Sequence, residues 1–500
     1  MIAISDPTPP APPPAAFNMA AHVLAHAPRL GDKIALAVLS PGGAQRWSYA
    51  RLESAVRGLA TGLQARGLQP GDRVLMRLGN DIDFPITYLA AIAAGLIPIP
   101  TSAQLTTREI TRIAQETTPR LIVAGAGIAL PEGDIPTLPA ADLPALYDLA
   151  PADYVLGASD RPAYIVYTSG TSGKPHAVTH AHRAIWARQM MFDGWYGLRE
   201  SDRLLHAGAF NWTYTLGTGL MDPWAMGATA LIPAAGVDSA MLPLLLRRHD
   251  ATIFAAAPGV YRQMLRGNIA PLPRLRHGLS AGEKLPESTR ARWQDATGTP
   301  IFEAFGMSEC STFISAAPDR PAPAGSIGYP QAGRRVAVLG PDGPAPRGTD
   351  GVLAISRDDP GLMLGYWNDP TATEARFRGE WFVTGDQARM DADGAITYLG
   401  RADDMMNAGG FRVSPAEVED VFSAHPGIRD CAAVEQQVKA DATAIWLFYT
   451  ADAPIDLDEL HAYGATHLAR YKAPRHFVHI DSIPRNANGK LLRRALHEQA

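Results

Sequence analysis

The sequence predicts an α/β fold in two parts, a large N-terminal domain of several subdomains with layered sheets and helices, and a small α+β C-terminal domain joined by a hinge. Three observations predict this fold. The chain has 500 residues, enough for several core-forming units. Helical and strand patterns alternate along most of its length. Near Gly400 the character changes, and the charged segment 401–404 precedes a block of about 100 residues, a usual domain size.

The elements of the larger part follow from apolar spacing and from its interruption by glycine and proline. Helices are expected at 52–66 and 84–95, and strands at 73–76, 163–167 and 176–180. The segment 96–101, with two prolines, ends one unit, and a similar rhythm runs from 203 to about 312. Proline-rich breaks at 318–323 and 341–346 mark loops in a zone richer in strands.

The smaller part has its own set of elements. We expect helices at 414–424 and 457–468, with strands at 428–434 and 443–449. The resulting division is a flexible Pro/Ala-rich tail over 1–16, an N-terminal domain over 17–400, a hinge over 401–404 and a mobile C-terminal domain over 405–500.

Composition excludes several classes of function. A net charge of −5 with 19% charged residues favours neither disorder nor a nucleic-acid surface. The two cysteines, Cys310 and Cys431, lie too far apart for a disulfide framework, which suits a reducing cytoplasm. The fourteen histidines lack the spacing of a zinc site. The longest apolar run, 89–99, is too short to span a bilayer, and the N-terminus lacks the pattern of a signal peptide.

The segment 167–175, with sequence YTSGTSGKP, is the most informative part of the chain. It follows an apolar strand, and its backbone N–H groups and hydroxyls can surround phosphate oxygens. Pro175 and the strand pattern after it distinguish the segment from the common nucleotide loop, which opens a helix. Taken alone, a plain Gly/Ser/Thr turn between strands is the alternative.

Three downstream segments bear on that choice, and each has an ordinary structural alternative. FEAFGMSE at 302–309 offers an aromatic ring, a close-approach glycine, a hydroxyl and a carboxylate that can bind a hard cation. VTGD at 383–386, with Gly400-Arg401 after it, offers a carboxylate and an arginine for sugar hydroxyls. The turn-rich 484–490 presents one lysine. Alone, these could be a polar turn, a surface aspartate and a solvated lysine.

In order and spacing, these segments resemble the adenylate-forming enzymes, which comprise acyl-CoA synthetases, adenylation domains and luciferases. The resemblance covers nearly the whole chain from about residue 20. It implies that a carboxylic acid attacks the α-phosphate of ATP, giving an acyl-adenylate, and that a thiol then displaces AMP. The implied cofactors are ATP, Mg²⁺ and coenzyme A.

The resemblance also implies the roles of individual residues. The catalytic residues are Lys490, Arg401 and Glu309, and Glu309 also binds Mg²⁺. Asp386 and Arg401 hold the ribose, Ser308 contacts the α-phosphate, and Lys490 neutralises charge developing between carboxylate and phosphate. The full ATP/AMP site comprises Thr168, Ser169, Gly170, Thr171, Ser172, Gly173, Lys174, Ala281, Gly282, Glu283, Glu303, Ala304, Phe305, Gly306, Met307, Ser308, Asp386, Arg401 and Lys490.

The family's two half-reactions imply a rotating C-terminal domain. Asp403 matches the hinge position, and rotation there would remove Lys490 and present a second face to the site. On that face, a tunnel for the thiol arm of CoA would be lined by Ala408, Gly409, Gly410, Phe411 and Arg412.

The acyl pocket is expected around the segment 206–216. Asn211 falls where amino-acid-activating relatives carry Asp, so an α-amino acid substrate is disfavoured. The pocket residues are Phe210, Asn211, Trp212, Leu216, Gly282 and Met307, although ordinary core is an equal alternative for the apolar ones. The chain looks most like benzoate-type or short- and medium-chain acyl-CoA ligases. We therefore expect a small apolar monocarboxylate, either aromatic or aliphatic.

The sequence departs from the family's pattern at three places, and two alternative functions remain open. His176-Ala177 replaces Lys-Gly, Ser308 replaces Thr, and Asn407 stands where many relatives have Lys. One alternative is a stand-alone ligase that loads a separate carrier protein in place of CoA. Another, of a different class, is a non-catalytic nucleotide sensor that keeps only the fold. A homodimer is also possible. We expect neither a nucleic-acid partner nor a membrane span.

Overall fold

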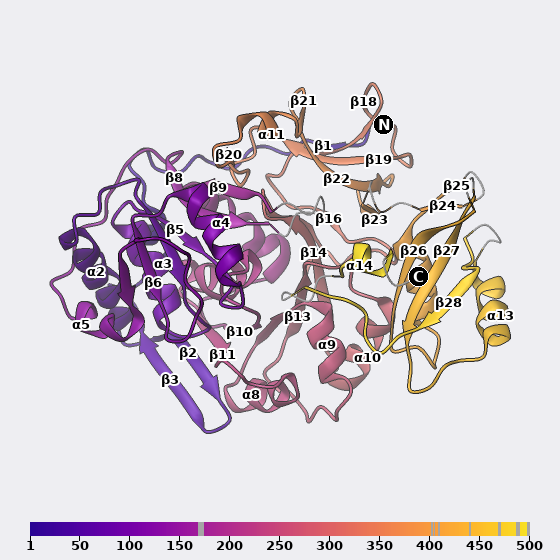
Figure 1. Ribbon diagram of the computed structural model, residues 1–500, viewed down its shortest axis with the longest axis horizontal. Helices are drawn as coiled ribbons and strands as arrows, with labels where there is room; N and C mark the ends of the chain where they lie inside the picture. The colour runs from indigo at the N-terminus through magenta and orange to yellow at the C-terminus, as the bar shows by residue number, and fades with distance from the viewer. Residues whose placement is uncertain are drawn as a thin grey trace.

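The computed structural model describes residues 1–168, 175–401, 404, 406–408, 411–439, 442–468, 472–486 and 491–497 (Figure 1). The predicted combination of a large layered α/β part with a smaller C-terminal part is confirmed. In Figure 1 the smaller part, drawn in orange to yellow, lies beside the part of the sheet that carries β13 and β14. The predicted site residues 169–174, Asp403, Gly409, Gly410 and Lys490 lie outside the described residues.

A nine-stranded sheet forms the centre of the large part. Six of its strands run parallel, and the edge strands on both sides are antiparallel. Because carboxyl ends of parallel strands meet at one edge, the loops after β10, β13 and β14 gather there. Its strands, in sheet order, are β16 (Tyr329–Pro330), β15 (Ser311–Ser315), β14 (Ile301–Met307), β13 (His277–Ala281), β12 (Ile253–Ala256), β10 (Arg203–Ala207), β11 (Thr229–Pro233), β2 (Ile34–Ser40) and β3 (Gly43–Ser48).

A second, four-stranded parallel sheet lies nearer the N-terminus, in the order β5 (Ile97–Pro100), β4 (Arg73–Arg77), β6 (Leu121–Ala124), β7 (Thr137–Pro139). Its helices are α2 (Tyr49–Ala65), α3 (Asp83–Ala93) and α4 (Thr107–Thr117). Ser48 caps α2, and Thr106 forms a capping box with Glu109 at the start of α4. The predicted helices and strands of this unit are confirmed within a few residues.

Between the two sheets lies a small antiparallel sheet, β20 (Gly365–Tyr366), β9 (Ala177–Ala181) and β8 (Pro162–Tyr167). The expectation of a strand after Pro175 is therefore confirmed by β9. Shorter helices complete the large part: α1 (Met19–Val23), α5 (Pro144–Tyr147), α6 (Ala184–Ala187), α7 (Asp222–Met226), α8 (Leu242–Arg248), α9 (Pro258–Met264), α10 (Glu287–Thr297), α11 (Pro370–Glu374), and the 3₁₀ and π segments η1 (Ala140–Asp142), η2 (Phe192–Tyr196), η3 (Thr215–Met221) and η4 (Ser239–Met241).

The strand-rich zone is a seven-stranded antiparallel sheet, which the chain's own start joins. Ile4 pairs with Ala337, and Ala3 is fully buried. The expected flexible tail over 1–16 is therefore anchored at its beginning, because the apolar residues before the proline tract extend a sheet edge. The strands are β1 (Ile4–Ser5), β17 (Val336–Gly340), β18 (Gly343–Pro344), β19 (Asp350–Ser356), β21 (Phe377–Arg378), β22 (Trp381–Met390) and β23 (Ile396–Arg401).

The C-terminal part packs its helices on a three-stranded sheet around a hydrophobic core of its own. Ser414 caps α12, as the sequence predicted for a helix beginning there. The elements are β24 (Met406–Ala408), β25 (Phe411–Val413), α12 (Pro415–Ser423), β26 (Asp430–Lys439), β27 (Ala442–Thr450), α13 (Leu457–His467), β28 (His476–His479) and α14 (Arg493–His497).

Candidate active site

Two antiparallel strands flank the predicted phosphate loop. Strands β8 and β9 are antiparallel partners, with Tyr167 opposite Ala177. Beyond them, the Thr168 N–H donates to the His176 carbonyl at 3.0 Å, and the His176 N–H donates to Thr168 Oγ1 at 3.2 Å. These two bonds fix both ends of the loop. The two residues that flank the predicted phosphate loop on its described sides are therefore held together.

Glu309 follows β14 in the turn toward β15 and is almost buried. Tyr366 donates its hydroxyl hydrogen to Glu309 Oε1 at 2.9 Å, and the Met363 N–H donates to the Glu309 carbonyl at 2.7 Å. His180 holds the residue before Glu309, because its Nε2 lies 2.7 Å from the Ser308 carbonyl. Both the carboxylate and the backbone of this turn are thus positioned by neighbouring strands.

Tyr366 links this turn to the hairpin. The His176 and Tyr366 rings pack with centroids 4.6 Å apart. A chain of contacts therefore runs from the base of the loop, through Tyr366, to Glu309. Sequence reasoning selected His176 and Glu309 separately and missed Tyr366, which lies far from both in the chain.

Asp386 and Arg401 are direct cross-strand partners on β22 and β23. Arg401 Nη1 donates to Asp386 Oδ2 at 3.4 Å and to the Thr384 carbonyl at 3.1 Å. The Tyr398 hydroxyl donates to Asp386 Oδ1 at 3.4 Å. Gly385 has a φ of 82°, so the backbone turns there in the left-handed region that glycine tolerates. The structure thus brings the two predicted ribose contacts together.

Phe305 stands beside that pair. Its ring packs against Tyr398 and Phe313, each with centroids 5.5 Å apart. At the next residue, Gly306, the pairing of β14 with β15 shifts register, and a Cβ there would lie 2.3 Å from the Ser311 carbonyl oxygen. Only glycine fits this close approach, so the Phe305–Gly306 step is sterically fixed.

The segment 281–283 leaves β13 beside an indole ring. A Cβ on Gly282 would lie 2.6 Å from the Trp212 ring, so glycine lets the indole approach the backbone closely. Glu283 is turned away from this contact. Arg485 Nη1 donates to both Glu283 carboxylate oxygens, at 2.7 and 2.8 Å. Burial raises the pKa of Glu283, and the Arg485 cation opposes that shift.

Glu303, predicted to lie at the nucleotide, is held by protein groups in this structure. Its side chain is buried and accepts hydrogen bonds from the Leu285 N–H at 2.8 Å and from Arg290 Nη2 at 3.0 Å. Burial raises its pKa to about 7, although Arg290 acts in the opposite direction. The side chain therefore supports the loop after Gly282 from beneath.

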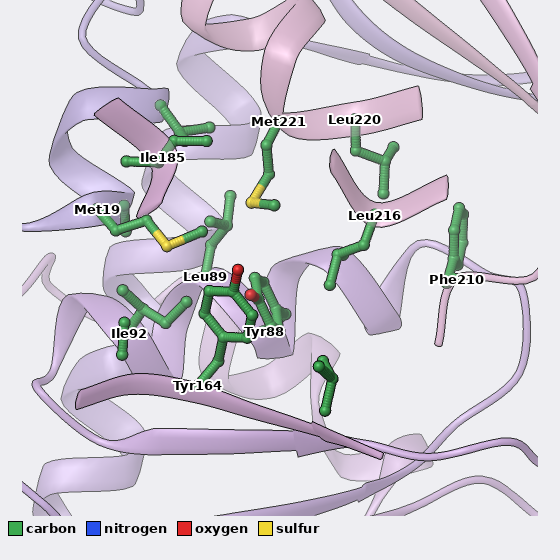
Figure 2. Packing of buried hydrophobic residues seen from close by; sticks show 14 of the residues in the cluster. Met19, Tyr88, Leu89, Ile92, Tyr164, Ile185, Phe210, Leu216, Leu220 and Met221 are labelled. Carbon is green, nitrogen blue, oxygen red and sulfur yellow. The ribbon is translucent and has the colours of Figure 1, made fainter. Parts of the chain in front are cut away.

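The predicted acyl-pocket residues separate into two groups. Phe210 is fully buried core packed on Phe84, with centroids 5.5 Å apart. Asn80, which sequence reasoning missed, fixes this loop by accepting from the Phe210 N–H and donating to the Gly208 carbonyl. Leu216 lines a cavity. Figure 2 shows its side chain among the buried residues of this region, which include Tyr88 and Tyr164. The lining of the cavity comprises Tyr88, Tyr164, His180, Arg188, Thr213, Leu216, Met221, Ser308 and Ser311.

The C-terminal part meets the large part through ion pairs near this edge. Besides Glu283–Arg485, Lys284 Nζ lies 2.5 Å from Asp420 Oδ2. Arg485 also pairs with Asp430 at 3.0 Å. Of the predicted CoA-tunnel residues, Ala408 and Phe411 are paired backbone positions on β24 and β25, as are Asn407 and Arg412.

Among the described residues, no cluster of three or more His, Cys, Asp or Glu side chains forms a metal site. Glu309 nevertheless fits Mg²⁺ bound with a nucleotide, because Mg²⁺ commonly takes one or two carboxylates and completes its shell with phosphate oxygens and water. Tyr366 occupies one oxygen of this carboxylate and orients the other. In the part of the chain that is described, no helix is both long and apolar enough to cross a membrane.

Comparison with known proteins adds to this geometry. A family model described as AMP-binding enzyme matches residues 23–367, and one described as AMP-binding enzyme C-terminal domain matches 417–490. A benzoate–CoA ligase of Thauera aromatica is 33% identical over 89% of this chain and 90% of that protein. A 3-hydroxybenzoate/4-hydroxybenzoate–CoA ligase of the same species is 31% identical over 90% and 91%. The crystal structure of a benzoate CoA ligase from Burkholderia xenovorans LB400 superposes with a TM-score of 0.85 at 27% identity, over 96% of this chain and all of that one.

Proposed function

The chain belongs to the AMP-binding enzyme family, and we propose that it joins a small aromatic carboxylic acid to CoA. It is an AMP-forming acyl-CoA ligase, which activates an acid as acyl-AMP and passes the acyl group to CoA. The identity of the acid, the residues of the site and the division at 401–404 are our proposals.

One observation carries the assignment of the site. The base of the phosphate loop, Tyr366 and Glu309 form one connected unit, and the Asp386–Arg401 pair stands beside Phe305. A nucleotide placed with its ribose at Asp386 and its phosphates toward Thr168 would lie along this edge of the sheets. Thr168 to Lys174 would hold the β- and γ-phosphates, and Phe305 would lie against the base.

In the first half-reaction the acid carboxylate attacks the α-phosphate and pyrophosphate leaves. Mg²⁺ held by Glu309 would neutralise phosphate charge. Ser308 would donate to an α-phosphate oxygen, and Lys490 would place a cation where negative charge develops, a contribution typically worth ~3–4 kcal/mol. Arg401, paired with Asp386, would fix the ribose so that the α-phosphorus stays in line with the acid.

In the second half-reaction the CoA thiol replaces AMP. We propose that rotation at Asp403 withdraws Lys490 and brings the segment 408–412 to the acyl-adenylate. The ion pairs Glu283–Arg485 and Lys284–Asp420 belong to the arrangement seen in this structure, with Arg485 only five positions before Lys490 in the chain. This arrangement supports the first half-reaction, because the segment carrying Lys490 is held against the edge that carries Gly282.

Pyrophosphate release, measured across a panel of acids with and without CoA, tests the proposal. We expect release that depends on an aromatic acid, on ATP and on Mg²⁺, followed by acyl-CoA formation. Acyl transfer to a phosphopantetheinylated carrier but not to CoA would instead identify a carrier-loading ligase. If no acid causes pyrophosphate release, the result would instead favour a non-catalytic nucleotide sensor.

A further inference from the structure

The cavity beside the predicted acyl site has an unusual lining for a pocket that binds an apolar acid. Seven of its nine lining residues, Thr213 among them, carry a hydroxyl, imidazole or guanidinium group. Only Leu216 and Met221 have an aliphatic or thioether side chain. Sequence reasoning expected an apolar, aromatic surface here. One lining residue is Ser308, which precedes Glu309 and is the residue predicted to contact the α-phosphate.

A buried ion pair forms the inner wall. Arg188 Nε donates to Asp222 Oδ1 at 2.8 Å, and Arg188 Nη2 donates to Asp222 Oδ2 at 2.6 Å. The Tyr196 hydroxyl donates to Asp222 Oδ2 at 2.7 Å. The guanidinium charge is therefore already balanced within the protein. A second carboxylate on the substrate would face Asp222 without a free cation, so this wall disfavours a dicarboxylic acid.

Two buried polar atoms in the lining have no hydrogen-bond partner within the described protein, the Tyr88 hydroxyl and His180 Nδ1. Tyr88 is fully buried on α3. In Figure 2 its hydroxyl lies next to that of Tyr164, on the side facing Met221. A buried hydroxyl without a partner is unfavourable, and such groups are normally satisfied by another polar group.

The state of His180 is set by its other nitrogen. Because Nε2 faces the Ser308 carbonyl, it carries the hydrogen, and Nδ1 is left as an acceptor. Burial lowers the pKa of His180 to about 4, so the ring is neutral near pH 7. Its ring stacks on Tyr164 with centroids 4.9 Å apart, which prevents it from turning toward another donor.

Ser311 completes the set. Its φ of 65° lies in the left-handed region, which is uncommon for a residue other than glycine, asparagine or aspartate. Ser311 Oγ accepts a hydrogen bond from Arg188 Nη1, so its own hydroxyl hydrogen stays available as a donor. The backbone is held in this conformation by the close approach of Gly306.

The size and chemistry of the cavity identify what it accepts. It leaves about 20 Å³ for the centre of a water-sized group, which is room for about one such group. The polar lining combines an acceptor, His180 Nδ1, with hydroxyls that donate or accept, on Tyr88 and Ser311. A phenolic hydroxyl has this size and both donates and accepts. A methyl group has the size without the hydrogen bonds, and a carboxylate only accepts.

We propose that this cavity is a specificity subsite that selects an aromatic acid carrying a ring hydroxyl. The proposal rests on the ligase function above and replaces the expected apolar acid with a hydroxy-substituted one. The hydroxyl donates to His180 Nδ1 and accepts from Tyr88 or Ser311, taking the place that one water fills when the acid is unsubstituted. Because that water supplies part of the same hydrogen bonding, we expect the hydroxy acid to exceed the unsubstituted acid by about 10- to 100-fold in kcat/KM. This is less than the ~10⁴-fold preference found where no water can take the place of the missing hydroxyl.

The test compares hydroxybenzoates with their size-matched methyl analogues. Acid-dependent pyrophosphate release is measured for benzoate, the three hydroxybenzoates, the three toluates and terephthalate. We expect one hydroxybenzoate to exceed both benzoate and its own toluate by about 10-fold or more in kcat/KM. Benzoate or a toluate equalling every hydroxybenzoate would overturn the subsite and leave the ligase function intact. Absence of release from every aromatic acid would instead contradict the proposed function.

Tyr88→Phe assigns the effect to the cavity. We expect it to remove most of the preference for the hydroxy acid, to keep release from benzoate, and to leave the thermal midpoint unchanged or raised, because no protein bond is lost. Tyr49→Phe is the matched control, since the Tyr49 hydroxyl donates to the Ala228 carbonyl at 2.6 Å away from this site. It should lower the midpoint and keep the preference. Unchanged preference in Tyr88→Phe and in Ser311→Ala would overturn the proposal.

Discussion

The hydrogen bond from Tyr366 to Glu309 gives the sharpest test of the site. Tyr366→Phe removes only the hydroxyl, so the ring that packs on His176 stays. The bond measures 2.9 Å and its acceptor is a nearly buried carboxylate. Hydrogen bonds to charged groups contribute about 1.5–3 kcal/mol. If that energy serves to orient Glu309, the variant loses about 10- to 100-fold in the first half-reaction.

The measurement is acid-dependent pyrophosphate release at a series of Mg²⁺ concentrations. Because Tyr366 acts through Glu309, the Mg²⁺ concentration that gives half the maximal rate should rise along with the loss of rate. Thioester formation from supplied acyl-adenylate should change much less, since it needs no pyrophosphate to leave. A purely structural role would lower the thermal midpoint and both half-reactions together, without moving the Mg²⁺ dependence.

Tyr329→Phe is the matched control. The Tyr329 hydroxyl also donates to a carboxylate at 2.9 Å, that of Asp393, but this bond is exposed and lies on the edge strand β16. The same chemical change should leave pyrophosphate release and its Mg²⁺ dependence at the level of the original protein. An equal effect in both variants, or no effect in Tyr366→Phe, would refute the reasoning.

The remaining predictions concern charge. Lys490→Ala should abolish pyrophosphate release yet keep thioester formation from supplied acyl-adenylate, as rapid mixing with CoA would measure; equal loss of both would exclude its role. His176→Lys should lower the apparent KM for ATP, unless His176 serves only to pack on Tyr366. Arg485→Ala should slow the first half-reaction more than the second and reduce its sensitivity to salt between low and high ionic strength. Stability should fall by about 1 kcal/mol per group as pH drops from 6.5 to 5.5, because the unfolded chain binds protons that the folded chain excludes. Thermal midpoints would show this, and the histidines with pKa values lowered to about 3 or 4 are His22, His180, His182, His206 and His277.

Local patterns in the sequence predicted the parts of the site that depend on local structure. The hairpin around 168–176 follows from an apolar strand, a run of small residues and Pro175, all close in sequence. The Asp386–Arg401 pair was also predictable, because a short strand–turn–strand segment places such residues on neighbouring strands. The contacts of Glu303 could not be predicted from the motif, because its partners Leu285 and Arg290 lie outside the segment 302–309.

The polar cavity could not be predicted, for a different reason. Tyr88 lies in a helix whose residues Phe84 to Ala93 are all buried, so no apolar periodicity distinguishes its hydroxyl from core. Arg188 and Asp222 are 34 positions apart and meet only when the end of α6 packs near the start of α7. A signal existed at Ser311, a hydroxyl two positions after the predicted metal ligand, but its orientation depends on a left-handed backbone that the sequence does not reveal.

The contacts between the two parts of the chain bear on how the second half-reaction becomes accessible. The pairs Glu283–Arg485 and Lys284–Asp420 are partly exposed, with side-chain exposures of 15% and 20%, and 25% and 39%. When such partly exposed pairs separate, both charges return to water, so their hydration offsets much of the lost attraction. An interface of buried leucines would resist separation far more strongly, at about 25 cal/mol per Å² of apolar surface exposed. Charged contacts at this edge thus orient the segment that carries Lys490 and keep the free energy needed to separate the two parts small. A domain that moves once in each turnover requires such a small cost.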